Sequence, residues 1–362
     1  QAGDRVGSYV VTELSNGNYV VVGSADNGGT SGNKITLFDA NGTVLAQSSV
    51  ASTVVGADNS SQPVAMANGE FAVFYAGGFT LFNAAGSVKQ ANTAFTTADS
   101  TVPLEAAQLG NGDLAVIYGN TQVGNKAVYY KVIHTDGTVV VNETALSPTN
   151  FVNTPVPYRI AATTMNDGRV ALFWENGGQG GYVYLNTNGT QVSPPTSYAV
   201  ASQGTTDIQA IALQNGGVAE ATFVQTTGTL NSPQSTDFMR GVMLTLYGAD
   251  GTRGRPISLE YGNYMNSDVS VAQLSNGYLV VGYTYDANGG NRSYAQILTA
   301  EGTFIEKITL PNQATNTDAL TVNALADNAF SVTLSTGGVP TQYIYKTTST
   351  GVSQTGTSAA DV

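Results

Sequence analysis

The side chains able to do chemistry are mostly carboxylates. The chain has 25 Asp and Glu, 13 Lys and Arg, one histidine and no cysteine. The single histidine, His134, excludes a multi-histidine metal site, and the absence of cysteine excludes thiolate chemistry. His134 also lies beside the Asp136-Gly137 turn, at the opposite end of its repeat from the variable loops, which disfavours a Ser–His–Asp triad. No glycine loop of the phosphate-binding type is present. These residue types predict binding rather than catalysis, and we expect no enzyme.

Acidic residues recur shortly before the first strand of most repeats. A ring of such carboxylates could hold a cation, with calcium as the expected cofactor if there is one. The alternative, which we favour, is that each Asp begins a turn by accepting hydrogen bonds from its own backbone. The residues of this candidate metal set are Asp58, Asp99, Asp207, Asp268 and Asp318.

Loops rich in acid, asparagine and glycine form a second candidate site. Alternating oxygen donors in a glycine-rich loop suit calcium or a polar ligand. The loop after Asp286 is a poor EF-hand match, because Ile297 stands where a ligating Glu is required. The candidate ligand-binding residues are Asp26, Asn27, Glu175, Asn176, Asp237, Asp286, Asn288 and Arg292. Asn-x-Ser/Thr sequons, which would carry glycans in a secreted eukaryotic protein, occur at Asn41, Asn59, Asn142, Asn188 and Asn291.

A repeat of about fifty residues must position these side chains. Each copy has an apolar run, an Asn-Gly or Asp-Gly turn and a second apolar run, followed by a similar pair around another glycine turn. Asn-Gly and Asp-Gly favour type I′ hairpins, and the runs between turns are rich in β-branched and aromatic residues. The first turns stand at 16–17, 68–69, 111–112, 167–168, 215–216, 276–277 and 327–328.

Seven four-stranded repeats predict an all-β fold, a seven-bladed β-propeller of antiparallel blades. A β-sandwich array fits less well, because each sandwich needs some hundred residues. We expect one propeller domain over residues 1–362. The variable insertions fall between the second and third strands of the repeats, so we expect function at that rim. The expected blades are 1–56, 57–100, 101–152, 153–206, 207–266, 267–316 and 317–362.

Composition narrows the partners and the compartment. The net charge of −12 disfavours nucleic acid and anionic membranes. Only 10 % of residues are charged, and Asn, Thr and Gly supply much of the polarity, which is typical of exported or cell-surface proteins. No apolar run reaches the length of a membrane helix. We therefore expect a secreted or cell-surface protein.

Two resemblances add to this interpretation. The phrase Leu, Asn-Gly, Tyr/Phe-Val-Val, followed by Phe-Asp-Ala-Asn-Gly-Thr at 38–43, resembles the degenerate repeats of large secreted bacterial calcium-binding and adhesin-type surface proteins. That resemblance implies an extracellular interaction role. Residues 24–30 resemble the Asp-box of sialidases, over seven residues and in one repeat only.

Three functions remain open from the sequence. The favoured one is a non-enzymatic interaction module, for adhesion or for matrix or filament assembly, with an extracellular protein, a glycan or a second copy as partner. The second is a glycan-binding propeller lectin. The third is a sialidase-like glycoside hydrolase, which would use two carboxylates at a defined separation.

Overall fold

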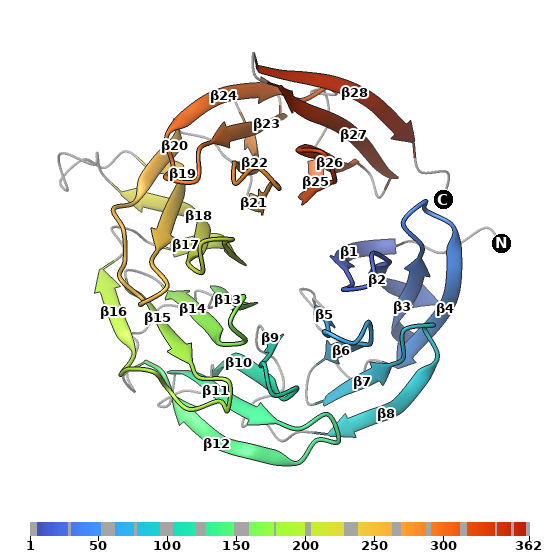
Figure 1. The fold of residues 1–362 in the computed structure, drawn as a ribbon. Coiled ribbons are helices and arrows are strands. Elements are labelled where there is room, and N and C mark those ends of the chain that lie inside the picture. Colours follow the sequence, from blue (N-terminus) through green and yellow to red (C-terminus); the bar gives the residue numbers. More distant parts are fainter. Residues whose placement is uncertain are drawn as a thin grey trace. The chain divides into compact units, whose positions relative to one another are not determined.

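A computed structural model gives the fold, which is all-β in the part of the chain that it describes (Figure 1). The described residues are 6–27, 30–51, 62–75, 78–94, 104–120, 127–147, 159–176, 179–199, 204–227, 238–262, 269–286, 291–311, 317–336, 339–348 and 351–359. Within these ranges, no helix is long and apolar enough to cross a membrane.

Seven antiparallel sheets, each of four consecutive strands, make the chain a seven-bladed β-propeller, as the repeat predicted. The first four blades comprise β1 (Val6–Glu13), β2 (Tyr19–Asn27), β3 (Thr30–Phe38), β4 (Val44–Ala51); β5 (Gln62–Ala65), β6 (Phe71–Tyr75), β7 (Gly78–Phe82), β8 (Val88–Ala94); β9 (Leu104–Gln108), β10 (Leu114–Asn120), β11 (Ala127–Ile133), β12 (Val139–Ala145); β13 (Arg159–Thr164), β14 (Val170–Asn176), β15 (Gln179–Leu185) and β16 (Thr196–Ala199).

The last three blades follow the same order. They comprise β17 (Gly204–Ala212), β18 (Val218–Thr227), β19 (Phe238–Tyr247), β20 (Ile257–Gly262); β21 (Val269–Gln273), β22 (Leu279–Asp286), β23 (Asn291–Leu298), β24 (Phe304–Thr309); β25 (Thr317–Ala324), β26 (Ala329–Thr336), β27 (Val339–Thr348) and β28 (Gly351–Ala359).

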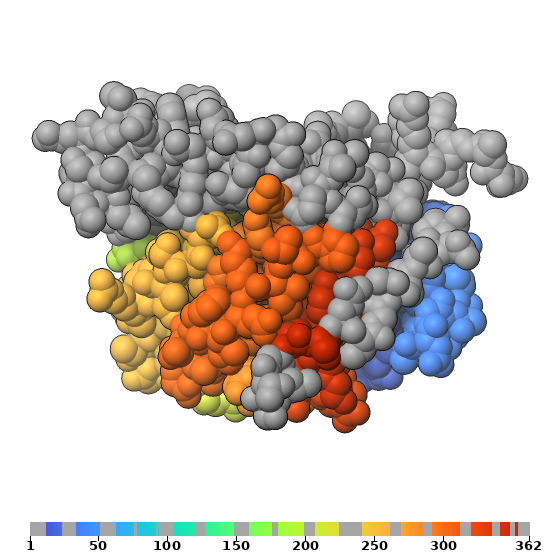
Figure 2. Space-filling model, turned by 90° about the horizontal axis from the view of Figure 1, so that it is seen from above, coloured from blue at the N-terminus to red at the C-terminus, as the bar shows by residue number. Residues whose placement is uncertain are grey.

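The chain divides into two compact units, residues 1–174 with 181–197, and residues 175–180 with 198–362. In each unit the core consists of apolar side chains between the faces of neighbouring blades. One cluster in the first unit joins blades 2 and 3 around Phe74, Phe79 and Tyr118. One in the second joins blades 5 and 6 around Phe223 and Tyr283. On one face of the second unit, parts of blades 5, 6 and 7 lie side by side, in yellow, orange and red (Figure 2).

The hairpin turns differ from the predicted type I′ form. In the first hairpin, Gly17 donates to the Leu14 carbonyl and Leu14 donates to Asn18. Gly17 has φ +80°, whereas Asn16 is not among the described non-glycine residues with positive φ. This is a three-residue loop with a type I turn and glycine at the left-handed position. Only Asp327 and Asn328, both at φ 57°, have the paired positive φ of type I′ among the described turns.

Neighbouring inner strands are tied by bonds between side chains and backbone. Asp207 accepts from Ile208 N at 2.9 Å and from Val269 N, in the next blade, at 2.9 Å. Gln209 accepts from Val271 N at 2.7 Å in the same way. The bonds to Val269 and Val271 each join residues about one repeat apart, so they couple blades that share no sheet ladder.

Candidate active site

Blade 5 places a carboxyl where the other blades place an aliphatic side chain. Glu220 is the third residue of β18 and the fourth after its turn glycine, and only 1 % of it is exposed. Its strand neighbours Ala219 and Ala221 face the core shared with blade 6, so Glu220 points to the opposite face of the sheet. The equivalent residues of the other blades are Val21, Val73, Val116, Leu172, Val281 and Val332.

Two phenols and a second carboxylate surround Glu220. Tyr247, the last residue of β19, donates its hydroxyl to Glu220 Oε2 at 2.5 Å. The Tyr198 hydroxyl, from β16, lies 3.1 Å from Glu220 Oε1 and 3.2 Å from Glu175 Oε1. Glu175, near the end of β14, is 4 % exposed. One phenol therefore bridges two buried carboxyl groups and a second phenol caps one of them.

Burial dominates the electrostatics of this cluster. Desolvation, and then the charge of Glu175, raise the pKa of Glu220 to about 8, against the smaller lowering effect of the tyrosine hydrogen bonds and Arg253. Burial, followed by the charges of Glu220 and Glu175, raises the pKa of Tyr198 well above its ordinary value. Glu220 is thus a carboxyl that holds its proton at neutral pH and loses it just above.

Arg253 brings the positive charge. Its Nε lies 3.3 Å from the Tyr247 hydroxyl, and its guanidinium carbon lies 4.0 Å from the centre of the Tyr198 ring. Arg253 is half-buried and forms no ion pair with a described residue. The equivalent residues are Val44, Val88, Val139, Gln191 and Phe304, of which the four apolar ones are exposed by 44 to 57 %.

A cavity of about 330 Å³ adjoins the cluster at the ends of the strands. Tyr247 is in its wall next to Leu246, whose side chain packs on the core shared with blade 6. The Tyr247 hydroxyl donates to Glu220 on the opposite face of the sheet, and only 2 % of Tyr247 is exposed. The other lining residues come from turns of blades 5 and 6 and their flanks: Leu213, Asn215, Leu246, Gly248, Thr252, Gly254, Ala300 and Glu301. Of the cluster, only Tyr247 is among the residues that line the cavity. A buried carboxyl with a raised pKa makes the cluster a candidate functional site.

Glycines provide the space for this arrangement. A Cβ on Gly217 would lie 2.3 Å from the Tyr247 carbonyl oxygen, so β19 approaches this turn closely only because residue 217 is glycine. A Cβ on Gly180 would lie 2.6 Å from Cε2 of Tyr198. Gly248 stands where blades 1 to 4 and 6 have a polar side chain, namely Asp39, Asn83, His134, Asn186 and Thr299. A Cβ on Gly248 would lie 2.6 Å from Asp250 Oδ1, so the Asp250 carboxylate takes the place of that side chain.

A second Tyr–Glu cluster in the same unit makes a useful contrast. Tyr283 donates to Glu260 at 3.0 Å, and Lys307 forms an ion pair with Glu260 and lies 4.0 Å from the Tyr294 ring centre. There a lysine neutralises the one carboxylate. In the Glu220 cluster, one arginine is present for two carboxyl groups. One negative charge would therefore stay uncompensated if both ionised, which favours a proton on one of the carboxyl groups.

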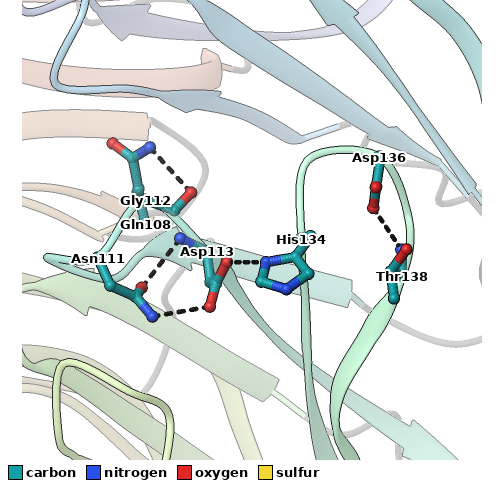
Figure 3. Close-up of polar contacts among 7 residues, drawn as sticks. All are labelled: Gln108, Asn111, Gly112, Asp113, His134, Asp136 and Thr138. Carbon is teal, nitrogen blue, oxygen red and sulfur yellow. Dashed lines mark hydrogen bonds and ion pairs between the residues drawn. The ribbon is translucent and has the colours of Figure 1, made fainter.

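His134 belongs to a third cluster, in blade 3 (Figure 3). Its Nδ1 contacts Asp113, whose carboxylate also accepts from Asn111 Nδ2 at 2.7 Å. His134 stands where Asp39 and Asn83 accept from backbone N–H groups of the equivalent turns, and Asp136 instead accepts from Thr138 N at 2.8 Å. The His134 side chain is 53 % exposed, and none of the cavity-lining residues is part of this cluster. These contacts serve the turn.

The structure brings only one predicted ligand residue, Glu175, into the cluster. The structure does not describe the side chains of several other candidates, although their backbones lie in strands: Asp26, Asn27, Asn176, Asp286, Asp318 in β25 and Asn291 in β23. Arg292 is exposed on β23, and the sequon residues Asn41, Asn142 and Asn188 lie at least partly exposed. Asp58, Asn59, Asp99, Asp237, Asp268 and Asn288 lie outside the described residues.

Asp207 is the one residue of the candidate metal set whose side chain is described, and it binds backbone N–H groups. Among the described residues, no group of three or more His, Cys, Asp or Glu is placed to hold a metal ion. The cavity also lies at the turn end of the strands, away from the loops where we expected function.

Sequence reasoning missed Glu220, Tyr198, Tyr247 and Arg253. A signal was available for two of them. Aligned on their turn glycines, blades 1 to 6 show an acid and an arginine in blade 5 at two positions where Val, Leu, Phe or Gln stand in the other five. Tyrosine is not a signal, because Tyr345 of blade 7 pairs with Phe330 as Tyr247 pairs with Val218. No alignment within the repeat marks Tyr198, because its strand follows a connection of different length.

Comparisons with known proteins give the fold. No family model and no curated protein matches the chain. An ulvan lyase of polysaccharide lyase family PL25, bound to a -[GlcA(1-4)Rha3S]- saccharide, matches at TM-score 0.59 and 10 % identity, over 98 % of both chains. KlHsv2 with loop 6CD replaced by a Gly-Ser linker matches at TM-score 0.59 and 8 % identity, over 99 % of both. The Dos1 propeller matches at TM-score 0.55 and 13 % identity, over 90 % of this chain and 75 % of its own.

These matches correct the predicted function. We expected a non-enzymatic interaction module and no enzyme. The fold is shared along its length with a polysaccharide lyase, so neither the propeller nor the lack of a histidine-based constellation excludes catalysis. The error has a physical reason: carboxyl, phenol and guanidinium groups can transfer protons and bind anions without histidine, cysteine or a metal.

Proposed function

We propose that this chain is a polysaccharide-cleaving enzyme of the lyase type, with its chemistry at Tyr247 and Glu220. The observation that carries the proposal is the concerted departure of blade 5 from its repeat. Glu220 and Arg253 stand where other blades have uncharged residues, and Tyr247, which lines a cavity, is hydrogen-bonded to both. A polysaccharide lyase with the same fold supports the choice of substrate class.

The reaction would begin with removal of a proton from the sugar carbon next to a carboxylate. The Tyr247 oxygen takes this proton while its own hydroxyl proton passes to ionised Glu220 along their 2.5 Å hydrogen bond. The electron pair of the broken C–H bond forms a carbon–carbon double bond. The neighbouring C–O bond breaks, and the leaving oxygen takes a proton from water. The hydroxide that remains takes up the proton that Glu220 gained, which restores water and the ionised Glu220. No water is added across the bond.

The pKa of Glu220 suits this role. A base is most effective when its pKa lies near the working pH, and burial raises the pKa of Glu220 to about 8. Tyr198 holds the two carboxyl groups together and lets the charge of Glu175 act on Glu220. We place Tyr198 as a positioning residue, because its hydroxyl points to carboxylates rather than to the cavity wall.

The test is cleavage of a panel of acidic and neutral polysaccharides by the purified chain, with products identified by mass spectrometry. An eliminated product carries a double bond at its new non-reducing end and weighs one water less than a hydrolysed one. We expect unsaturated products from an acidic polysaccharide. Hydrolysed products, or no cleavage of any member of the panel, would contradict the proposal.

A polysaccharide is met outside the cell, so the proposal keeps the predicted secreted or cell-surface location and a glycan as partner. Detection of the protein in the culture medium or on the surface of the cells that naturally produce it would support this location. Its retention in the cytosol would contradict it.

A further inference from the structure

We infer that Asn41 is a site of spontaneous deamidation, where Gly42 N and the Asn41 side chain close a cyclic imide that water then opens. The reaction needs no enzyme and no ligand. A glycine after the asparagine hinders it least, because glycine has no side chain next to the attacking nitrogen. Seven Asn-Gly pairs stand in described hairpin turns, and they begin at Asn16, Asn41, Asn68, Asn111, Asn188, Asn215 and Asn276. Two features separate Asn41 from the other six.

The chemistry sets what the folded chain must allow. The lone pair of Gly42 N attacks Cγ of Asn41, so that an N–Cγ bond forms and the Cγ–Nδ2 bond breaks. The Nδ2 group leaves as ammonia, with the proton of Gly42 N. Water opens the imide at either carbonyl and leaves aspartate or isoaspartate at position 41. The Asn41 side chain must therefore be able to rotate, and Gly42 must be accessible to water.

The first feature is that Asn41 does not hold its own turn. In the other six turns the Asn side-chain oxygen accepts from the backbone N–H two residues on, as Asn188 does from Thr190 at 3.1 Å. In the Asn41 turn, Asp39 Oδ1 accepts instead, from Asn41 N at 2.9 Å and from Thr43 N at 2.8 Å. Among the described residues, none donates to the side-chain oxygen of Asn41.

Asp39 is the stronger acceptor for this N–H group. The hydrogen bond from Thr43 N, with smaller effects from Asn41, lowers the pKa of Asp39 below its ordinary value, so Asp39 is ionised at neutral pH. The Asn41 side chain makes the smallest of these contributions. An ionised carboxylate only accepts, so that contact engages the amide nitrogen of Asn41, which is the leaving group, and not its oxygen.

The second feature is the exposure of the glycine. Gly42 is exposed, with nothing within 4 Å of the place where a Cβ would be. The other six glycines are buried or half-buried, and a Cβ on Gly189 would lie 2.6 Å from Cγ2 of Val132. In all seven turns the glycine N–H donates to the carbonyl three residues back, at 2.8 to 3.0 Å. That bond must break in each turn, so it does not favour one pair over another.

The product alters the β3–β4 hairpin. Isoaspartate adds a carbon atom to the backbone of a turn whose length fixes the pairing of the two strands. Aspartate adds a second carboxylate to the turn that already holds Asp39. Because β4 is the outer strand of its sheet and pairs only with β3, we expect faster hydrogen exchange of β4 amides in the converted protein.

Peptide mapping by mass spectrometry tests the site. The chain is produced in a host without N-glycosylation, because Asn41 is also a sequon residue, and the folded protein is kept at mildly alkaline pH. We expect Asn41 to convert at least about three-fold faster than the other six, since their reaction must first break one more hydrogen bond. A parallel series in urea should show similar rates at all seven pairs. Equal rates in the folded protein, or a lead of Asn41 that persists in urea, would overturn the inference.

One substitution tests the hydrogen-bond argument directly. Asp39→Ala frees Thr43 N for the Asn41 side chain, which can then hold its turn as Asn188 does, so conversion of Asn41 should slow. Asn83→Ala is the matched control, because Asn83 accepts in the same way in a turn of blade 2 that has no Asn-Gly pair. Thermal unfolding checks that both variants are folded. Unchanged or faster conversion of Asn41 in Asp39→Ala, or equal slowing in both variants, would overturn the inference.

Discussion

At the scale of single residues, Glu220 differs from the equivalent residue of every other blade. The other six blades have an aliphatic residue at this position. Blade 5 has the carboxyl of Glu220 there, close to a second carboxyl. Burying a carboxyl costs free energy unless it stays protonated or is paired. The two phenols and Arg253 reduce that cost without removing it, because the pKa of Glu220 remains raised.

Glu220→Gln should therefore alter the pH dependence of stability. The folded state binds a proton at Glu220 up to about pH 8, whereas an ordinary carboxyl releases it near its value of 4.5. The wild type then loses stability as the pH rises from the lower to the higher of these values, by at most about 1.4 kcal/mol for each pH unit. A glutamine stays neutral and avoids the loss. Unfolding in denaturant, measured across this interval, should show that the free energy of unfolding of the variant rises relative to that of wild type as the pH rises.

Glu260→Gln is the contrasting control, because it removes an ion pair with Lys307. We expect that substitution to destabilise the protein at neutral pH. A wild-type pH profile that is flat between weakly acidic and alkaline conditions would contradict the buried, protonated Glu220.

Tyrosine substitutions separate proton transfer from positioning. Tyr247→Phe should lower kcat by about a hundred-fold or more, as expected for loss of an acid–base group. Tyr198→Phe should shift the pH profile of kcat, since it removes the hydroxyl that bridges Glu175 and Glu220. Tyr283→Phe is the matched control, a buried tyrosine that also donates to a glutamate. Equal effects in Tyr247→Phe and Tyr283→Phe would indicate a structural role only.

At the scale of elements, the turns decide both the repeat and the shape of the site. Strand pairs, blade number and turn positions were predictable because each glycine turn fixes its neighbours locally. The turn type was predicted wrongly: Asn-Gly dipeptides are common to type I′ turns and to type I turns with a left-handed glycine, and strand register decides between them. Only Asp327-Asn328 has the predicted form among the described turns.

Gly17→Ala tests this turn geometry. Gly17 has φ +80° and nothing within 4 Å of the place where a Cβ would be, so the cost is conformational alone. We expect a loss of about 1 kcal/mol, measured by denaturant unfolding. Gly17→Asn should cost less, because asparagine tolerates the left-handed region. No loss in either variant would mean that the turn does not hold this conformation.

The ties between blades are a second element-scale feature. Asp207→Asn should destabilise the protein by about 1–3 kcal/mol, because an amide nitrogen cannot accept from Val269 N or Ile208 N. Since backbone donors occupy both oxygens, we expect the same loss with and without millimolar calcium, followed by thermal unfolding. A calcium-dependent difference between wild type and variant would instead support the predicted metal role of Asp207.

At the scale of the whole molecule, the sequence predicted the fold far better than the site. A propeller follows from a local pattern repeated seven times, whereas the Glu220 cluster joins β14, β16, β18 and β19 through contacts that only the folded chain creates. The chain as a whole is acidic, with a net charge of −12. Binding of an acidic saccharide would therefore require a locally positive site.

The most direct measurement is elimination of an acidic polysaccharide by wild type and Glu220→Gln, followed over pH by the ultraviolet absorbance of the unsaturated product. We predict that the wild-type rate rises with an inflection near the pKa of Glu220, about 8, and that Glu220→Gln, although folded, is inactive at every pH. A folded Glu220→Gln protein that cleaves at the wild-type rate with the same pH profile would contradict the account.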